Sequence, residues 1–160
     1  MIRTCALNVA FHRRRAKSAS KRAKTIDIIA ALLAAIAGVG ILSEFKGVPD
    51  TLWAVLAFFS GLVGQLRSVF GLSDMELEHR KLQNDYSSVL STLNSLIDRA
   101  KEAGGLTQEL DTQRQLILER FHFVAERDET DYKPEEIDPL QQEVNEAYPP
   151  DSLWMPPGTS

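Results

Sequence analysis

The sequence predicts an all-α protein: a two-helix transmembrane hairpin that follows an N-terminal basic amphipathic helix and precedes a long cytoplasmic helical or coiled-coil hairpin. Two apolar runs, 26–45 and 52–69, are separated by a short polar turn. A heptad pattern follows them, and no stretch shows the strict alternation of a half-buried strand. We therefore divide the chain into residues 1–25, 26–70, 73–127 and 128–160.

The segment 1–25 is predicted to be a basic helix on the membrane surface. Residues 1–24 carry eight Lys or Arg and no acidic residue. Such a segment is attracted to anionic lipid headgroups. A cleaved signal peptide is the alternative, but it would leave the second apolar run unexplained, and a basic transit peptide is a further competitor.

Each apolar run is long enough to cross a bilayer. At about 1.5 Å per residue, the two helices would reach roughly 30 Å and 27 Å. A buried soluble hairpin is the alternative, but neither run is patterned as a half-buried helix, and a chain of 160 residues offers little other apolar material to cover both. Basic residues precede the first run and follow the second run. Because such residues stay on the cytoplasmic side, we expect both termini in the cytoplasm.

Small and polar residues recur inside the two runs. Small residues at spacings of three and four predict close helix packing, and they are Ala30, Ala34, Gly38, Ala57, Gly61 and Gly64. Asp27 and Arg67 lie near helix ends, where snorkelling to the interface is the simplest role. Gln65 is placed to line water or to bond to another helix.

Ser73 fits the N-cap of a capping box with Glu76 and is predicted to begin a long helix. Residues at alternating spacings of four and three form a coiled-coil seam for subunit association, with Leu82, Tyr86, Val89, Leu93 and Leu96 at its centre. Gly104 and Gly105 are predicted to end this helix, and Thr107 to cap a second one. His79 on the seam is a polar residue that sets register, an exposed flank or a proton sensor.

The segment 128–160 is predicted to be a disordered tail. It carries nine Asp or Glu, one Lys and six Pro, a composition that cannot bury enough apolar surface to fold alone. An apolar island, 153–155, is either a short docking motif or has no role.

The sequence contains no converging set of catalytic groups. His12, His79 and His122 are far apart, no HExxH motif or phosphate-binding glycine loop is present, and Cys5 is the only cysteine. We therefore expect no enzyme activity, no metal site, no cofactor and no nucleic-acid partner.

The chain resembles the SLATT family over roughly residues 10–125. The residues that carry the resemblance are His79 and Tyr86 after the second apolar run, together with the entry segment RRRAKSASKRAK. SLATT proteins are bacterial two-span membrane proteins of nucleotide-signalled antiphage systems, regarded as effectors that form pores or disrupt the inner membrane. The resemblance implies a bacterial inner-membrane location and a trigger, such as a sensor or nucleotide-signalling protein, that lies in another chain.

The sequence thus leads to the hypothesis of a homo-oligomeric effector that forms a pore or a membrane lesion when triggered, in antiviral defence with growth arrest or cell death. Asp27, Gln65 and Arg67 are the residues expected to line or rim the pathway. A membrane-anchored coiled-coil scaffold that recruits a soluble partner is the alternative. A holin-like or toxin-antitoxin membrane peptide ranks third, because the soluble part is longer than such proteins usually need.

Overall fold

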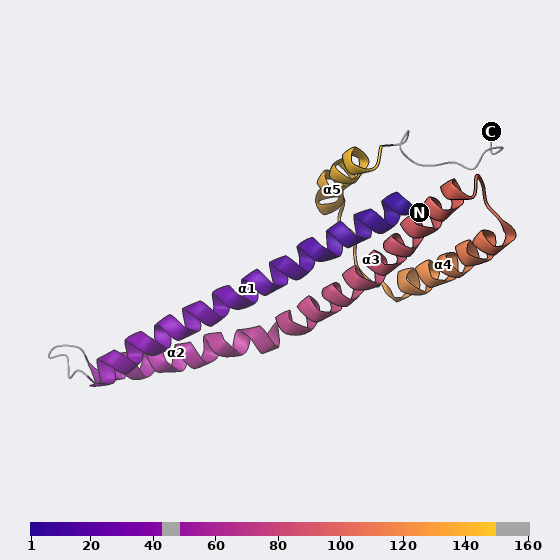
Figure 1. Ribbon diagram of the computed structural model, residues 1–160. Coiled ribbons are helices and arrows are strands. Elements are labelled where there is room, and N and C mark those ends of the chain that lie inside the picture. The colour runs from indigo at the N-terminus through magenta and orange to yellow at the C-terminus, as the bar shows by residue number, and fades with distance from the viewer. Residues whose placement is uncertain (43–48, 150–160) are drawn as a thin grey trace. The chain divides into compact units, whose positions relative to one another are not determined.

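A computed structural model describes residues 1–42 and 49–149, and over these residues the chain is helical, with no strand (Figure 1). The fold class predicted from the sequence, all-α, is confirmed for this part of the chain. The helices are α1 (Ile2–Leu42), α2 (Asp50–Val69), α3 (Leu72–Glu102), α4 (Gln108–Arg127) and α5 (Pro134–Ala147).

The chain divides into two compact units. The bundle unit comprises Met1–Arg14 and His79–Ser160, and the hairpin unit comprises Arg15–Glu78. Helices α1 and α3 each contribute one part to either unit. The predicted boundary near residue 25 is not a helix boundary, because α1 contains no proline and no glycine before Gly38 to interrupt it.

The connection between α2 and α3 is a two-residue turn. The amide of Phe70 donates to the carbonyl of Leu66 (2.9 Å), and Gly71 follows with φ of +56°, a conformation that favours glycine. Helix α3 therefore begins at Leu72, one residue earlier than predicted, and Ser73 lies in its first turn. There the Ser73 hydroxyl accepts a hydrogen bond from Arg67 Nε (3.1 Å).

The end of α3 and the start of α4 agree with the predictions. Gly104 has φ of +73°, and Gly105 donates its amide to the carbonyl of Ala100 (2.9 Å), as in a Schellman motif. The Thr107 hydroxyl accepts a hydrogen bond from the amide of Leu110 (3.3 Å) and caps α4.

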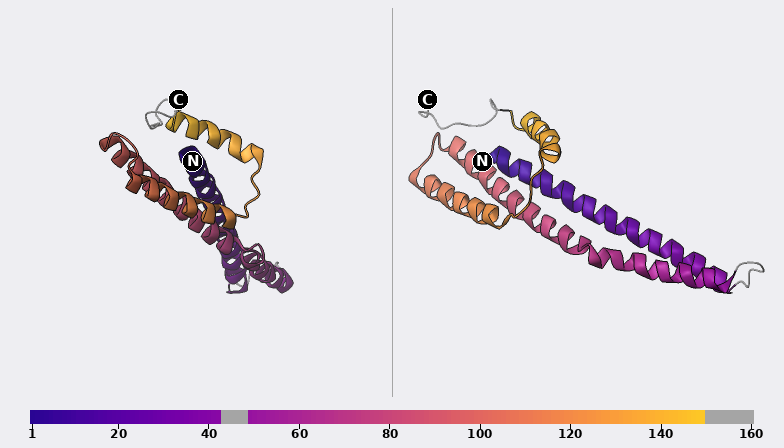
Figure 2. Two further views of the ribbon diagram at one scale, coloured as in Figure 1. Left: turned by 90° about the vertical axis from the view of Figure 1, so that its right-hand side faces the viewer. Right: turned by 180° about the vertical axis from the view of Figure 1, so that it is seen from behind.

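The core of the bundle unit lies among the first turns of α1, helix α3 and helix α4. Figures 1 and 2 show α3 and α4 side by side after the glycine turn. Every residue of the predicted oligomer seam is at most 6% exposed: Leu82, Tyr86, Val89, Leu93 and Leu96. The prediction that this seam pairs subunits is wrong, because its apolar stripe is covered by α1 and α4 of the same chain.

The first turns of α1 also correct the prediction of a membrane-surface helix over residues 1–25. Cys5, Phe11 and His12 are at most 1% exposed within the bundle unit. Their face of the helix meets the apolar residues of α3 and α4, so it is not available to lipid. Among the basic residues of this segment, Arg13, Lys17 and Lys24 are exposed.

The predicted disordered tail contains a helix. Pro134 occupies the first turn of α5, where its missing amide and fixed φ are tolerated, and Glu135 and Glu136 follow in the same turn. Leu140 and Val144, one turn apart, are at most 6% exposed. The prediction of disorder is thus wrong for 134–147, and the apolar island 153–155 lies outside the described residues.

Candidate functional site

Helices α1 and α2 of the hairpin unit lie antiparallel and side by side (Figures 1 and 2). The residues turned toward the partner helix recur at spacings of three and four. They are Ile26, Ala30, Leu33 and Ala37 on α1 and Trp53, Leu56, Ser60 and Val63 on α2. The Ser60 hydroxyl donates a hydrogen bond to the carbonyl of Ala30 (2.9 Å), which links a side chain of α2 to the backbone of α1.

The opposite faces of α1 and α2 expose large apolar side chains. Ile28, Leu32 and Val39 on α1 are 58–60% exposed, and Phe58 on α2 is 66% exposed. One helical stretch, Thr51–Glu102, counts as long and apolar enough to cross a membrane, and 6% of its apolar window is buried. The first predicted span, 26–45, extends beyond the described residues.

The predicted packing residues divide between the two faces. Ala30 and Gly38 are partly buried, whereas Ala34, Ala57, Gly61 and Gly64 are exposed. A Cβ atom added to Gly38, Gly61 or Gly64 would meet nothing within 4 Å. The inward positions of α2 thus hold Leu56, Ser60 and Val63, whereas Ala57, Gly61 and Gly64 face outward, so their role in helix packing stays a prediction.

The three residues predicted to line or rim the pathway do not lie together: Asp27 and Arg67 form a pair, and Gln65 lies apart from them. Arg67 Nη1 donates to Asp27 Oδ2 at 2.8 Å, and both side chains are about half exposed, at 43% and 48%. This ion pair bridges α1 and α2 at the end of the hairpin distant from Leu42 and Asp50. Gln65 is exposed and lies one residue after Gly64, on the outward side of α2.

A cluster of polar side chains is buried in the bundle unit. The Asp128 carboxylate follows α4, and its Oδ2 atom accepts from Tyr86 Oη (3.0 Å), from Tyr132 Oη, and from His12 Nε2 (2.9 Å). His12 Nδ1 in turn contacts His79 Nδ1 at 3.1 Å. The cluster thus joins α1, α3 and the segment between α4 and α5.

The cluster excludes water almost completely. The side chains of His12 and Asp128 are 0% and 2% exposed, and Tyr86 is 1% exposed. The contact between the two Nδ1 atoms requires one shared proton, since two N–H groups or two lone pairs would repel each other. The two ring nitrogens of His12 thus have separate partners: Nδ1 shares a proton with His79 Nδ1, and Nε2 contacts the Asp128 carboxylate.

Burial and hydrogen bonding act in opposite directions on the pKa of Asp128. Burial alone would raise this pKa, but hydrogen bonds from Thr130, Tyr132 and His12 outweigh burial and hold it below its ordinary value. Burial, followed by the nearby Asp128 charge and hydrogen bond, raises the pKa of both Tyr86 and Tyr132. The cluster thus favours an ionised carboxylate and two neutral phenols.

The contacts of the cluster hold helices together. Other residues line the hollows on α5, in the hairpin unit and between α3 and α4. No group of three or more His, Cys, Asp or Glu among the described residues could hold a metal ion. Phe11 packs on Tyr132 with ring centroids 4.7 Å apart and closes one side. We call the cluster of His12, His79, Tyr86, Asp128 and Tyr132 the clasp, because it fastens α1 to α3 and to the end of α4.

Cys5 is 0% exposed and lies in the core of the bundle unit. Burial raises the pKa of its thiol to about 11, an effect that the charged N-terminus reduces only in part. The thiol is therefore a small apolar group of the core.

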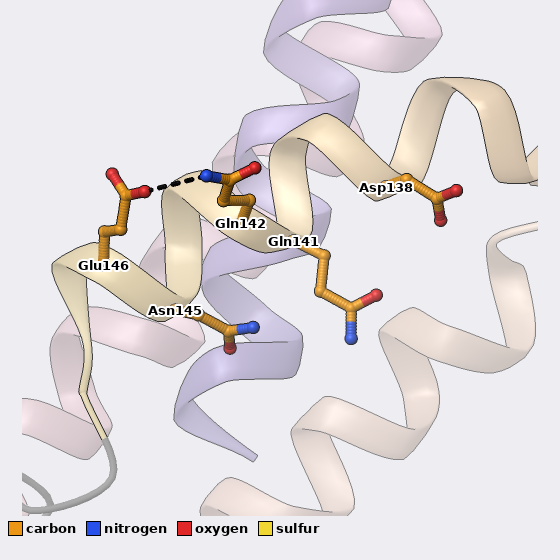
Figure 3. Close-up of a pocket in the computed structure, with 5 residues that line it drawn as sticks. All are labelled: Asp138, Gln141, Gln142, Asn145 and Glu146. Carbon is orange, nitrogen blue, oxygen red and sulfur yellow. Dashed lines mark hydrogen bonds between the residues drawn. The ribbon is translucent and has the colours of Figure 1, made fainter.

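The outer face of α5 carries a polar hollow of about 430 Å³ (Figure 3). Its lining residues, Asp138, Gln141, Gln142, Asn145 and Glu146, all come from one helix. Gln142 Nε2 donates to Glu146 Oε1 at 3.1 Å, one turn away, and Asp138 lies at the far end of the row. These side chains line a solvated helix face and do not converge on a reacting atom.

No family model, no curated protein and no solved structure matches this chain.

Proposed function

We propose that this chain is a membrane protein whose hairpin unit crosses the bilayer twice and associates with further copies to form a pore or lesion, while the bundle unit stays in the cytoplasm and receives the trigger. The observation that carries the proposal is the outward surface of α1 and α2, which combines large apolar side chains with the polar Gln65 and a small-residue surface.

The exposed apolar side chains support insertion into a membrane. Such a contiguous apolar surface is unfavourable in water, and burial in hydrocarbon gains roughly 25 cal/mol per Å². Phe58, Phe59 and Leu62 are 46–66% exposed on α2, and Ile28, Leu32 and Ile36 are 51–60% exposed on α1. Basic residues precede the apolar part of α1 and follow that of α2, so the charge distribution supports cytoplasmic termini.

Gln65 supports association between copies. A side-chain amide that faces hydrocarbon lacks hydrogen-bond partners, and a neighbouring helix supplies them. Gly61 and Gly64 lie beside Gln65 and would let such a helix approach closely, since the space beside each is open. A second copy of the hairpin would therefore supply hydrogen-bond partners to the Gln65 amide and would also cover the small-residue surface.

The effector role rests on the resemblance to SLATT proteins, which implies a bacterial inner membrane, a trigger from another protein and a function in antiviral defence. In this proposal, Gln65 lines the pathway and the Asp27–Arg67 pair forms its cytoplasmic rim. The pair is electrically neutral, which fits a position where it costs little to keep near lipid headgroups.

Membrane potential measured with a voltage-sensitive dye in a bacterial host tests the proposal. Expression of the parent chain is expected to depolarise the inner membrane, and Gly61→Leu with Gly64→Leu is expected to abolish the effect, as is Gln65→Leu to a lesser degree. The glycine variant is expected to keep the hairpin intact, because a Cβ atom at either position meets nothing within 4 Å. A loss of activity then reports on contacts between chains.

Val55→Leu with Leu62→Phe is the matched control, since it enlarges two exposed apolar positions on the other flank of the outward face. It is expected to depolarise like the parent. A parent chain that stays in the soluble fraction would refute the membrane proposal, and equal depolarisation by the parent and the glycine variant would refute assembly through this surface.

A scaffold role is the second candidate, and α4 carries the observation that favours it. Leu116 and Phe123, two turns apart, are 60% and 62% exposed on the surface of the bundle unit, and the Arg127 guanidinium lies 5.7 Å from the Phe123 ring centre. An apolar helix face of this kind suits a partner protein. In that case the membrane stays polarised, and Leu116→Ser with Phe123→Ser abolishes recruitment of the partner.

A further inference from the structure

The hairpin unit contains an amphipathic groove of about 610 Å³ that the proposed function does not use. One wall is a face of α1 that presents Ser18, Lys21, Arg22 and Thr25 at helical spacing. The opposite wall is formed by the turn after α2 and the start of α3, with Phe70, Leu72 and Met75. One side of the groove is thus polar and basic, and the other is apolar.

The basic wall is not neutralised by the protein. Lys21 and Arg22 are exposed and form no ion pair with any described residue, and no carboxylate lines the groove. The Thr25 hydroxyl donates to the carbonyl of Lys21 at 3.0 Å, which keeps it on the same face. An anion in the groove would therefore meet two cations without competition from acidic side chains.

The apolar wall is continuous with the surface assigned to lipid. Phe70 and Met75 are 61% and 40% exposed, whereas Leu72 is 5% exposed and forms the floor. Ile26, which also lines the groove, is the first residue of the apolar run on α1. The groove lies where basic sequence changes to apolar sequence, the level of the headgroups if the hairpin spans the bilayer.

We infer that this groove binds one anionic phospholipid, with the phosphate between Lys21 and Arg22 and the upper acyl chain against Phe70 and Met75. The inference rests on the proposed membrane insertion and adds a specific ligand to it. A free anion would leave the apolar wall uncovered, and a neutral lipid would leave the two cations unpaired. A molecule with an anionic head and an apolar tail satisfies both walls.

Native mass spectrometry of the full chain in mild detergent tests this inference with phosphatidylglycerol and with phosphatidylcholine of the same acyl chains. The parent is expected to retain phosphatidylglycerol in preference. Lys21→Gln with Arg22→Gln is expected to weaken its retention on the order of tenfold, since each basic residue near an anionic lipid contributes substantially. Met75→Gln is expected to weaken it without any change of charge.

Lys17→Gln with Lys24→Gln is the matched control, because it removes two exposed charges from the same stretch of α1 outside the groove. Equal loss in the two double variants would overturn the inference in favour of diffuse attraction. Displacement of the lipid by inorganic phosphate would overturn it in favour of a simple anion site. Extraction of the chain from membranes by alkaline carbonate tests insertion separately, so failure of the lipid site is distinguishable from failure of the hairpin.

Discussion

Helix α1 passes through two regions that bury opposite parts of its surface. In the bundle unit Phe11 is 1% exposed, whereas in the hairpin unit Ile28 is 60% exposed, although both are large apolar residues of one helix. The difference follows from the number of neighbours. Residues 2–14 pack with α3 and α4, whereas the apolar part of α1 has only α2 beside it within the hairpin unit.

The comparison shows that apolar content alone does not tell which part of a helix the protein buries. The bundle unit places its apolar residues inward and its charges outward, as water-soluble domains do. The hairpin unit buries small or medium residues such as Ala37 and Ser60 between its helices and leaves phenylalanines outside. This arrangement is the one expected of a hairpin in an apolar surrounding, as proposed above, and the predictions below separate the two regions.

The largest expected effect concerns a leucine in each region. Leu96→Ala removes a side chain that is 3% exposed in the bundle core and is expected to cost about 2–5 kcal/mol of unfolding free energy. Leu62→Ala removes one that is 46% exposed and is expected to cost less than about 1 kcal/mol. Thermal unfolding followed by circular dichroism, with the full chain in detergent, measures both.

Two results would contradict this contrast. An equal drop in melting temperature would show that Leu62 is also covered by protein, as in an assembled oligomer under those conditions. No drop for Leu96→Ala would show that the bundle core contributes little to the stability of the chain. Ile28→Ala on α1, also exposed, is the matched control for Leu62→Ala.

The local signals for helix ends were sufficient to predict part of this fold. Gly104 and Thr107 act through backbone and capping chemistry within a few residues, so their roles can be deduced from short windows. The helix α5 was missed because its prolines and acidic residues indicated disorder. Leu140 and Val144, spaced by four, were the available signal for a buried face.

The seam and the clasp depend on contacts between distant parts of the chain. A heptad pattern predicts an apolar stripe but not which helix covers it. Leu93 was therefore predicted to contact another subunit, whereas α1 and α4 of the same chain cover it. His12 and Asp128 are 116 positions apart, and no spacing rule connects them. Only His79 and Tyr86, seven residues apart on α3, were singled out from the sequence.

The clasp is expected to make the bundle unit sensitive to both extremes of pH. The pKa of Asp128 is lowered on folding, so its contribution to stability is present above about pH 4 and is lost as the pH falls through its folded value. The pKa values of Tyr86 and Tyr132 are raised, so their contribution is present below about pH 10 and is lost at higher pH.

Melting temperatures measured from pH 3 to pH 11 check this profile. Tyr132→Phe is expected to reduce the decline at high pH, because it removes one of the two buried phenols. Tyr148→Phe is the control. The contact of Tyr148 with Arg3 Nε is made by its backbone carbonyl (2.9 Å), which this substitution keeps. An unchanged alkaline decline in Tyr132→Phe would exclude this phenol as its source and leave Tyr86 and Cys5, whose pKa is raised to about 11, as the remaining groups.

The smallest expected effect concerns the ion pair of the hairpin unit. Asp27 and Arg67 are about half exposed, and pairs of this kind contribute at most about 1 kcal/mol. A double-mutant cycle with Asp27→Asn and Arg67→Gln, measured by unfolding in detergent, is therefore expected to give a coupling energy below about 1 kcal/mol that falls with added salt. A larger coupling that resists salt would mean that the pair is shielded from water, as it would be if neighbouring copies closed over the cytoplasmic rim. The same cycle at high and low protein concentration separates these cases, because only contacts between chains depend on dilution.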